Sequence, residues 1–262
     1  MGAQGPPGPP GSSERLRFRY TKRGKIRFTS QRDVARLWER ALRRSGLAVA
    51  WSGGFSPRPL LSFGLALPTG AESLGEYLDV RLDLGERAVD DPSGLPASLS
   101  DVMPEGLVVQ AAAMVDDGAG SLQQDVASCA WELEVSGVSA AELTTRVERL
   151  LGSPSVVIRR VRKGRPVDDD LRPAVRALAT IDGAAAGWPD GSGTCRLRAE
   201  LTTHPRGVRP GELLEGLGAD LVLARACRTH QWIERDGARW EPLTTSGRPP
   251  DASAPHAQER AS

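Results

Sequence analysis

The sequence predicts an α+β protein made of two halves, each with the element order βαββαβ and an antiparallel sheet. Stretches of alternating apolar and polar residues recur along the chain, as in half-buried strands. Two longer stretches with helical periodicity lie among them, at residues 30–46 and 139–151, one in each half. The 262 residues are enough for one large domain or two small ones, since domains cluster at roughly 100–150 residues.

The first half starts with a strand over residues 15–20, where apolar and basic side chains alternate strictly. The alternation returns over residues 25–28 and predicts a second strand. Residues 30–46 predict a helix because Ser30 and Asp33 have the spacing of a capping pair and Gly46 suits a helix end. Further strands are predicted at residues 47–51, 60–67, 76–84 and 107–115, with a short helix at 95–103.

The second half repeats this order. Ser139 caps the predicted helix 140–151, and Asp236-Gly237 predicts the turn of a closing hairpin at 232–240. The other predicted elements are strands at 126–135, 156–161, 174–181, 195–202 and 221–227 and a helix at 211–217. This order is that of the ferredoxin-like split βαβ motif, in which helices cover one face of the sheet and leave the other free.

We therefore divide the chain into four parts. Disordered tails are predicted at residues 1–14 and 246–262, which are rich in Gly, Pro and Ser or Ala. Between them we expect a basic ferredoxin-like domain at residues 15–118 and a second ferredoxin-like domain at 121–243, separated by an acidic, Gly-rich stretch.

Charge is distributed unevenly along the chain. Residues 15–58 hold thirteen Lys and Arg but two Asp and Glu, a net charge of +11, whereas the whole chain has a net charge of +1. An asymmetry of this size favours a polyanionic partner for the basic segment. Three widely spaced cysteines and three histidines predict no disulfide framework and no metal site. With no membrane span and no apolar signal segment, we expect a cytoplasmic protein without a cofactor.

One long motif resembles a known family. It runs from K-I-R-F-T-S through S-G-G-F-S-P-R-P to A-L-P-T-G-A-E-S, and R-K-G-R-P-V-D-D-D-L-R-P is a further match. The chain resembles the radical-SAM-associated family, a domain of unknown function whose members occur alone, or fused to or encoded beside a cobalamin-binding radical SAM protein. The resemblance implies a radical SAM protein as partner and a role in modifying RNA or a related substrate. The chain lacks the CxxxCxxC that holds a radical SAM cluster, so it resembles the accessory part.

The candidate RNA-binding residues lie in two basic segments and one loop. In Ser52–Pro59, Gly53 and Gly54 allow close backbone approach, while two prolines hold Arg58 in place. An exposed Arg58 would bind phosphate, whereas Arg58 paired with Glu76 or Asp79 would be structural. The residues expected to contact RNA or another anion are Arg17, Arg19, Arg32, Arg36, Arg40, Arg43, Ser52, Gly53, Gly54, Arg58, Lys163 and Arg165.

Two alternatives stay open beside an RNA-binding accessory protein. One is an RNA-processing or RNA-modifying enzyme, an endoribonuclease or an enzyme that uses Asp168 or Asp170. The other is an adaptor whose basic face binds an acidic protein. Because no acid/base pair, metal set or nucleophile stands out, we expect no activity from the chain alone.

Overall fold

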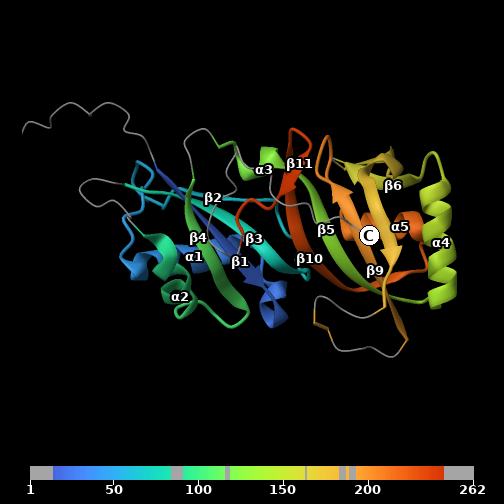
Figure 1. The fold of residues 1–262 in the computed structure, drawn as a ribbon, viewed down its shortest axis with the longest axis horizontal. Helices are drawn as coiled ribbons and strands as arrows, with labels where there is room; N and C mark the ends of the chain where they lie inside the picture. The colour runs from blue at the N-terminus through green and yellow to red at the C-terminus, as the bar shows by residue number, and fades with distance from the viewer. Residues whose placement is uncertain are drawn as a thin grey trace, which may run out of the picture.

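The computed structural model describes residues 14–83, 91–115, 119–162, 164–182, 187–188 and 193–244. Within these residues the chain forms a mixed α+β structure around one large, mostly antiparallel sheet of nine strands (Figure 1). This confirms the predicted α+β class. Residues 1–13 and 246–262, which make up nearly all of the two predicted tails, lie outside the described residues.

The N-terminal half contributes four strands in the order β4-β1-β3-β2, all antiparallel. Two α-helices and two 3-10 helices connect them. The elements are β1 (Arg15–Lys22), η1 (Gly24–Phe28), α1 (Gln31–Ser45), β2 (Leu61–Phe63), β3 (Glu72–Arg81), η2 (Pro92–Gly94), α2 (Leu95–Ser100) and β4 (Leu107–Val115).

The C-terminal half contributes four strands in the order β10-β5-β9-β8 and the short strand β11 beside β10. A separate two-stranded ribbon, β6–β7, lies between α4 and β8 in the sequence. The elements are α3 (Leu122–Asp125), β5 (Val126–Ser136), α4 (Ala140–Gly152), β6 (Val157–Arg162), β7 (Arg165–Asp170), η3 (Arg172–Ala174), β8 (Val175–Thr180), β9 (Thr194–Thr202), α5 (Pro210–Leu217), β10 (Val222–Arg235) and β11 (Ala238–Trp240).

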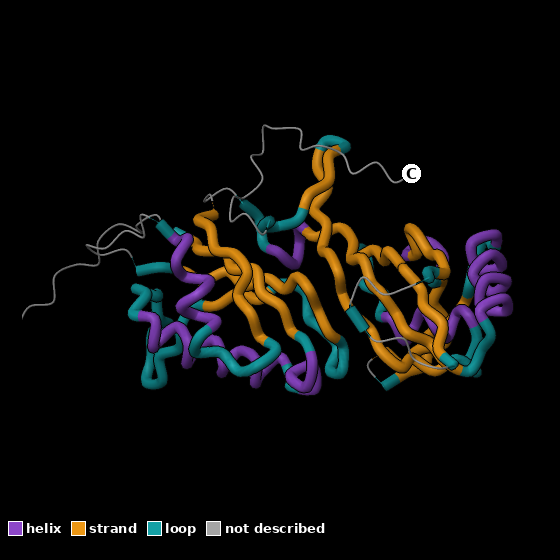
Figure 2. Tube along the Cα trace, turned by 60° about the horizontal axis from the view of Figure 1, so that its bottom comes forward, coloured by secondary structure: helices purple, strands orange, loops and turns teal. Residues whose placement is uncertain are grey.

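The two halves join edge to edge in the same sheet. Strand β3 pairs with β2 through residues 78–80 and with β10 through residues 72–73, and the β3–β10 contact is parallel. Figure 2 shows the strands of both halves running through the middle of the molecule, with helices beside each half. The two halves therefore share one sheet and meet in it at a short parallel contact.

Each half has its own apolar core. Trp38 of α1 packs with Phe18 and Tyr20 of β1, whose ring centroids lie 5.3 Å and 5.1 Å from it. In the C-terminal half, α4 and α5 pack on the side of β5 that carries Trp131 and Leu133. The alternation predicted for residues 15–20 is confirmed, since the apolar side chains of β1 are buried under α1.

Several element boundaries differ from the prediction. Residues 25–28 form the 3-10 helix η1, not a strand, because Gly24 turns the chain at φ +67°. The predicted loop after residue 163 contains strand β7, which pairs with β6 across a turn at Gly164. The predicted strand 221–227 is longer, because β10 continues into the closing hairpin. The predicted turn is confirmed, with positive φ at both Asp236 and Gly237.

Candidate nucleic-acid interface

Helix α1 separates an apolar face from a basic one. It begins after Ser30, whose hydroxyl accepts a hydrogen bond from the Asp33 amide at 3.2 Å, and it ends at Gly46 in the left-handed conformation, φ 71°. Its buried side chains are Val34, Trp38, Ala41 and Leu42. The solvent-facing side chains include five exposed arginines, Arg32, Arg36, Arg40, Arg43 and Arg44. The helix therefore presents a row of guanidinium groups to solvent.

Few carboxylates offset these charges on the helix itself. Asp33 pairs with Arg36 at 3.1 Å, and both side chains are more than half exposed. An ion pair of this kind contributes about 0–1 kcal/mol and is screened by salt, so it leaves Arg36 able to exchange its partner. Glu39 is the one other acidic residue of α1.

Exposed aromatic rings stand at both ends of α1. Before the helix, the Phe28 side chain is 62% exposed and Cζ of Arg27 lies 4.4 Å from its ring centroid. After it, Trp51 is 42% exposed and Cζ of Arg43 lies 5.0 Å from its ring centroid. These distances are typical of cation–π contacts, which place a cation beside each exposed ring.

The loop after Trp51 is closed by its own backbone. The Ser52 amide donates to the Arg58 carbonyl at 2.8 Å, and the Arg58 amide donates to the Ser52 hydroxyl at 3.1 Å. Gly54 has φ +105°, a conformation that favours glycine. Phe55 at the tip is fully exposed. The loop thus holds an aromatic ring in solvent beside the end of α1.

Arg58 lies exposed at the base of this loop. The structural alternative placed it against Glu76 or Asp79, but Glu76 pairs with Arg228 and Asp79 pairs with Arg17. Arg58 therefore belongs to the solvent-facing group, together with Gly53 and Gly54, where an added Cβ would meet nothing within 4 Å. We call these residues the basic-aromatic surface: Phe28, Arg32, Arg36, Arg40, Arg43, Arg44, Trp51, Gly53, Gly54, Phe55 and Arg58.

Arg17 and Arg19, which we expected to contact RNA or another anion, are buried. Arg17 donates to both carboxylate oxygens of Asp79, at 2.6 Å and 2.8 Å, and Arg19 donates to Glu241 at 2.6 Å. Arg17 is 5% exposed and Arg19 is 7% exposed. The segment after β11 covers part of both side chains, because Arg17 also donates to the Pro242 carbonyl. These two arginines bind the end of the described chain rather than an external anion.

The acidic residues of the β6–β7 ribbon have structural partners. Asp168 pairs with Arg159 at 3.1 Å on the surface. Asp170 accepts hydrogen bonds from the amides of Val156 and Arg172, at 2.8 Å and 3.0 Å, and these bonds lower the pKa of its carboxyl. Neither carboxylate has the buried, acid–base-paired setting of a catalytic group. Arg165 is exposed on the ribbon, whereas Lys163 lies outside the described residues.

Of the three cysteines that could take part in metal or thiol chemistry, Cys129 and Cys227 are buried. Across the ranges that the structure describes, no group of three or more His, Cys, Asp or Glu side chains is placed to hold a metal ion. Burial raises the pKa of the Cys129 thiol and raises that of Cys227 to about 12, so neither is a thiolate near neutral pH. None of the helices in the described ranges has the length and apolar character needed to cross a bilayer.

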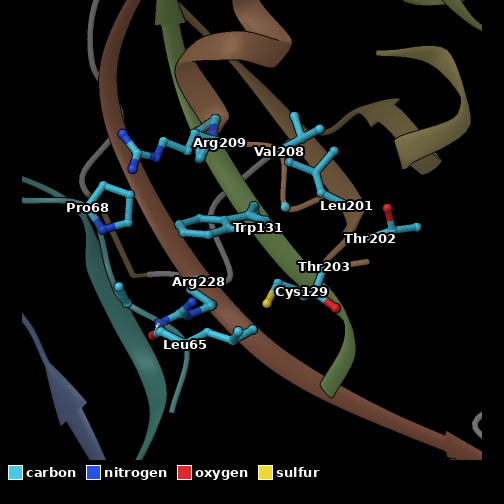
Figure 3. A pocket seen from close by; sticks show the side chains of 13 residues that line it. Leu65, Pro68, Cys129, Trp131, Leu201, Thr202, Thr203, Val208, Arg209 and Arg228 are labelled. Atoms are coloured by element: carbon cyan, nitrogen blue, oxygen red, sulfur yellow. Dashed lines mark hydrogen bonds between the residues drawn. The ribbon is translucent and has the colours of Figure 1, made fainter. Parts of the chain in front are cut away.

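A pocket between the halves was not foreseen. It has a volume of about 230 Å³ and lies where the loops 64–71 and 203–209 approach β5 and β10 (Figure 3). Its wall includes Trp131 and the fully buried Arg228, whose guanidinium donates to Glu76 of the other half at 2.7 Å. Arg228 is one of three arginines in β10, so the sequence held no signal that singled it out.

Comparison with known families identifies one match. Residues 15–210 match a family described as an uncharacterized protein conserved in bacteria (DUF2344). This description says nothing of a radical SAM enzyme, so that partner stays a prediction. No curated protein is significantly similar in sequence.

Two solved structures resemble this chain at low sequence identity. A chain of the crystal structure of a Cbf5-Nop10-Gar1 complex has 10% identity and a TM-score of 0.43 over 82% of this chain and 49% of its own. A chain of an H/ACA RNP bound to a substrate RNA containing 2'-deoxyuridine has 9% identity and a TM-score of 0.42 over 84% and 48%. This chain thus spans about half the length of the chains it matches. Similarity at this level carries no argument about function.

Proposed function

The chain belongs to this bacterial family, DUF2344, and from that premise we propose that it is an accessory protein that binds RNA through its basic-aromatic surface. One observation carries the proposal: the exposed arginine row of α1 lies between exposed rings at both of its ends. Arginines neutralise backbone phosphates, and aromatic rings stack on bases without regard to sequence. An arginine row together with exposed aromatic rings suits RNA better than either feature does alone.

The size of the surface agrees with this use. The arginine row of α1 runs from Arg32 to Arg44, so it is about 18 Å long at 1.5 Å per residue. Phosphates of one duplex strand recur about every 3.4 Å along the axis, so a row of this length can follow several of them. Arg58 and Phe55 extend the surface beyond Trp51 at the end of the helix.

Two finer parts of the proposal concern architecture and partner. We propose that each half is a ferredoxin-like unit, which the orders β4-β1-β3-β2 and β10-β5-β9-β8 support, because each places the half's last strand beside its first. A radical SAM protein is proposed as the partner on the strength of the sequence motifs alone.

The direct test is charge reversal on α1. We expect Arg36→Glu/Arg40→Glu to weaken binding of a labelled single-stranded RNA regardless of its sequence. The slope of log K against log salt should become shallower by about 1.4, since each phosphate contact contributes about 0.7 on single strands. Binding is measured by fluorescence anisotropy at several salt concentrations.

Arg149→Glu on α4 is the matched control, because Arg149 is also an exposed helical arginine but lies in the other half. Arg40→Glu should weaken binding and Arg149→Glu should leave it unchanged. Equal effects of the two substitutions would mean that net charge, not this surface, governs binding. Binding of an acidic protein but not of RNA would favour the adaptor instead.

Catalysis is tested separately. Purified protein incubated with an RNA transcript should leave the RNA unchanged, because Asp168 pairs with Arg159 and Asp170 accepts hydrogen bonds from the backbone. Cleavage or modification that is lost in Asp170→Asn would replace the accessory role with an enzymatic one.

A further inference from the structure

The pocket between the halves has one wall from each half. The C-terminal half supplies an apolar wall from Trp131, Leu201 and Val208. The N-terminal half supplies Leu65, Ala66 and Pro68. Leu65 and Pro68 lie across the pocket from Leu201 and Val208 (Figure 3). Its volume of about 230 Å³ is slightly smaller than the roughly 300–1,000 Å³ of drug-sized sites, which suits a small ligand. The flat indole ring of Trp131 in the apolar wall suits a ligand that has a flat ring of its own.

Positive charge in the pocket exceeds negative charge. Arg228 is 2% exposed, and Glu76 offsets its charge through hydrogen bonds of 2.7–2.9 Å. Arg209, just before α5, is exposed and lines the same pocket. Its side chain extends toward Pro68 on the far side (Figure 3). One guanidinium at the opening is thus left to attract a single anionic group.

Arg228 also holds the loop that closes the pocket. Its Nη2 donates to the Leu65 carbonyl at 2.8 Å, while its guanidinium carbon lies 5.5 Å from the Trp131 ring centroid. The same side chain therefore fixes both walls.

The pocket loop continues toward the basic-aromatic surface. The amide of Gly70 donates to the Arg27 carbonyl at 2.8 Å, and a Cβ placed on Gly70 would lie 4.0 Å from the Phe28 ring. Phe28 is the member of that surface that precedes α1. A strand bound along α1 would therefore end near the loop that forms one wall of the pocket.

We propose that this pocket binds one nucleotide, with its base against the Trp131 wall and its phosphate on Arg209. This inference rests on the proposed RNA-binding function. It adds a second site, separate from the basic-aromatic surface, that holds a single nucleotide. A nucleotide combines the flat apolar part and the single anionic group that the two walls and Arg209 match. It reaches the pocket either as a free molecule or as one unit of an RNA chain.

The experiment is a titration followed by NMR of the tryptophan indole N–H groups in the full chain. Trp131 reports on the pocket and Trp51 on the basic-aromatic surface, with both signals assigned by through-bond experiments. The probes are the four nucleoside 5′-monophosphates, the corresponding nucleosides, inorganic phosphate and a six-nucleotide single-stranded RNA. We expect at least one monophosphate to shift Trp131 with saturation.

Two variants and one control sharpen the assignment. Arg209→Ala should weaken monophosphate binding about tenfold, since it removes a charge-assisted hydrogen bond. Ala66→Trp should abolish the Trp131 response by filling the pocket from its exposed loop, which leaves the core unchanged. Arg149→Ala should have no effect. The hexanucleotide should shift Trp51 in all three variants.

The outcomes separate the two proposals. A hexanucleotide that shifts Trp51 while no monophosphate shifts Trp131 would overturn the pocket and leave RNA binding standing. Equal shifts by inorganic phosphate would reduce the site to a simple anion site and overturn the nucleotide. A Trp131 response without any Trp51 response would support a free nucleotide and refute the RNA surface. Loss of the hexanucleotide's Trp131 shift in Ala66→Trp would support a unit of the chain as occupant.

Discussion

The buried Arg228–Glu76 pair makes a strong prediction about stability. Arg228 comes from β10 and Glu76 from β3, so the pair links the halves at their parallel contact. Their side chains are 2% and 6% exposed. Arg228→Met removes the cation and leaves a buried carboxylate without its partner, which costs about 3–5 kcal/mol of the unfolding free energy. For a chain of this size, that equals a melting-temperature decrease of roughly 6–20 °C.

A double substitution separates this cost from lost packing. Glu76→Leu/Arg228→Met replaces the pair by apolar side chains, and replacing both members of a buried pair is often neutral. The Leu65 carbonyl still loses its donor, so we expect the double variant to stay about 1–3 kcal/mol below the parent. Urea unfolding followed by circular dichroism measures all three proteins. The reasoning fails if Arg228→Met unfolds within about 1 kcal/mol of the parent, or if the double variant is less stable than the single one.

Three further predictions concern residues singled out by their sequence. Arg17→Met should lower the unfolding free energy by at most about 3–5 kcal/mol, because the buried Asp79 then keeps the longer contact with Arg15 at 3.7 Å, and should leave the salt dependence of RNA binding unchanged. Asp170→Asn should destabilise the protein at neutral pH. The difference in stability should vanish as the pH falls through the folded-state pKa of Asp170, which is lowered below its ordinary 3.8, because residue 170 is then uncharged in both proteins. A pH-independent difference in urea unfolding would contradict this. Arg58→Lys should keep the melting temperature and net charge but weaken RNA binding, since an ammonium cannot bind phosphate bidentately; unchanged anisotropy titrations would show that the fork geometry is irrelevant.

Local periodicity predicted the elements whose partners are close in sequence. Helix α1 was predicted from Ser30, Gly46 and its apolar spacing, and all three act as expected. The β10–β11 turn followed from Asp236-Gly237, because two positive φ angles suit that dipeptide. The strand expected at residues 25–28 was wrong, since alternation over four residues does not distinguish a strand from a 3-10 turn that leaves Phe28 exposed.

Contacts between distant segments could not be read from the pattern. Period-two alternation assigned Arg17 and Arg19 correctly to the face opposite Phe18, but it does not say what covers that face. The cover is Glu241 and Pro242, more than 200 residues away, after a hairpin that returns to the first strand. The pocket escaped prediction for the same reason, because its walls come from both halves.

The arginines of the basic segment therefore divide by the element that carries them. A strand inside a nine-stranded sheet has neighbours on both edges and two faces to cover, so Arg17 and Arg19 are buried and must be paired. A helix packed by one stripe has no such neighbours on its other side, so Arg32, Arg40 and Arg44 stay in solvent. The +11 charge of residues 15–58 therefore overstates the charge that is exposed to solvent, because Arg17 and Arg19 are paired inside the fold.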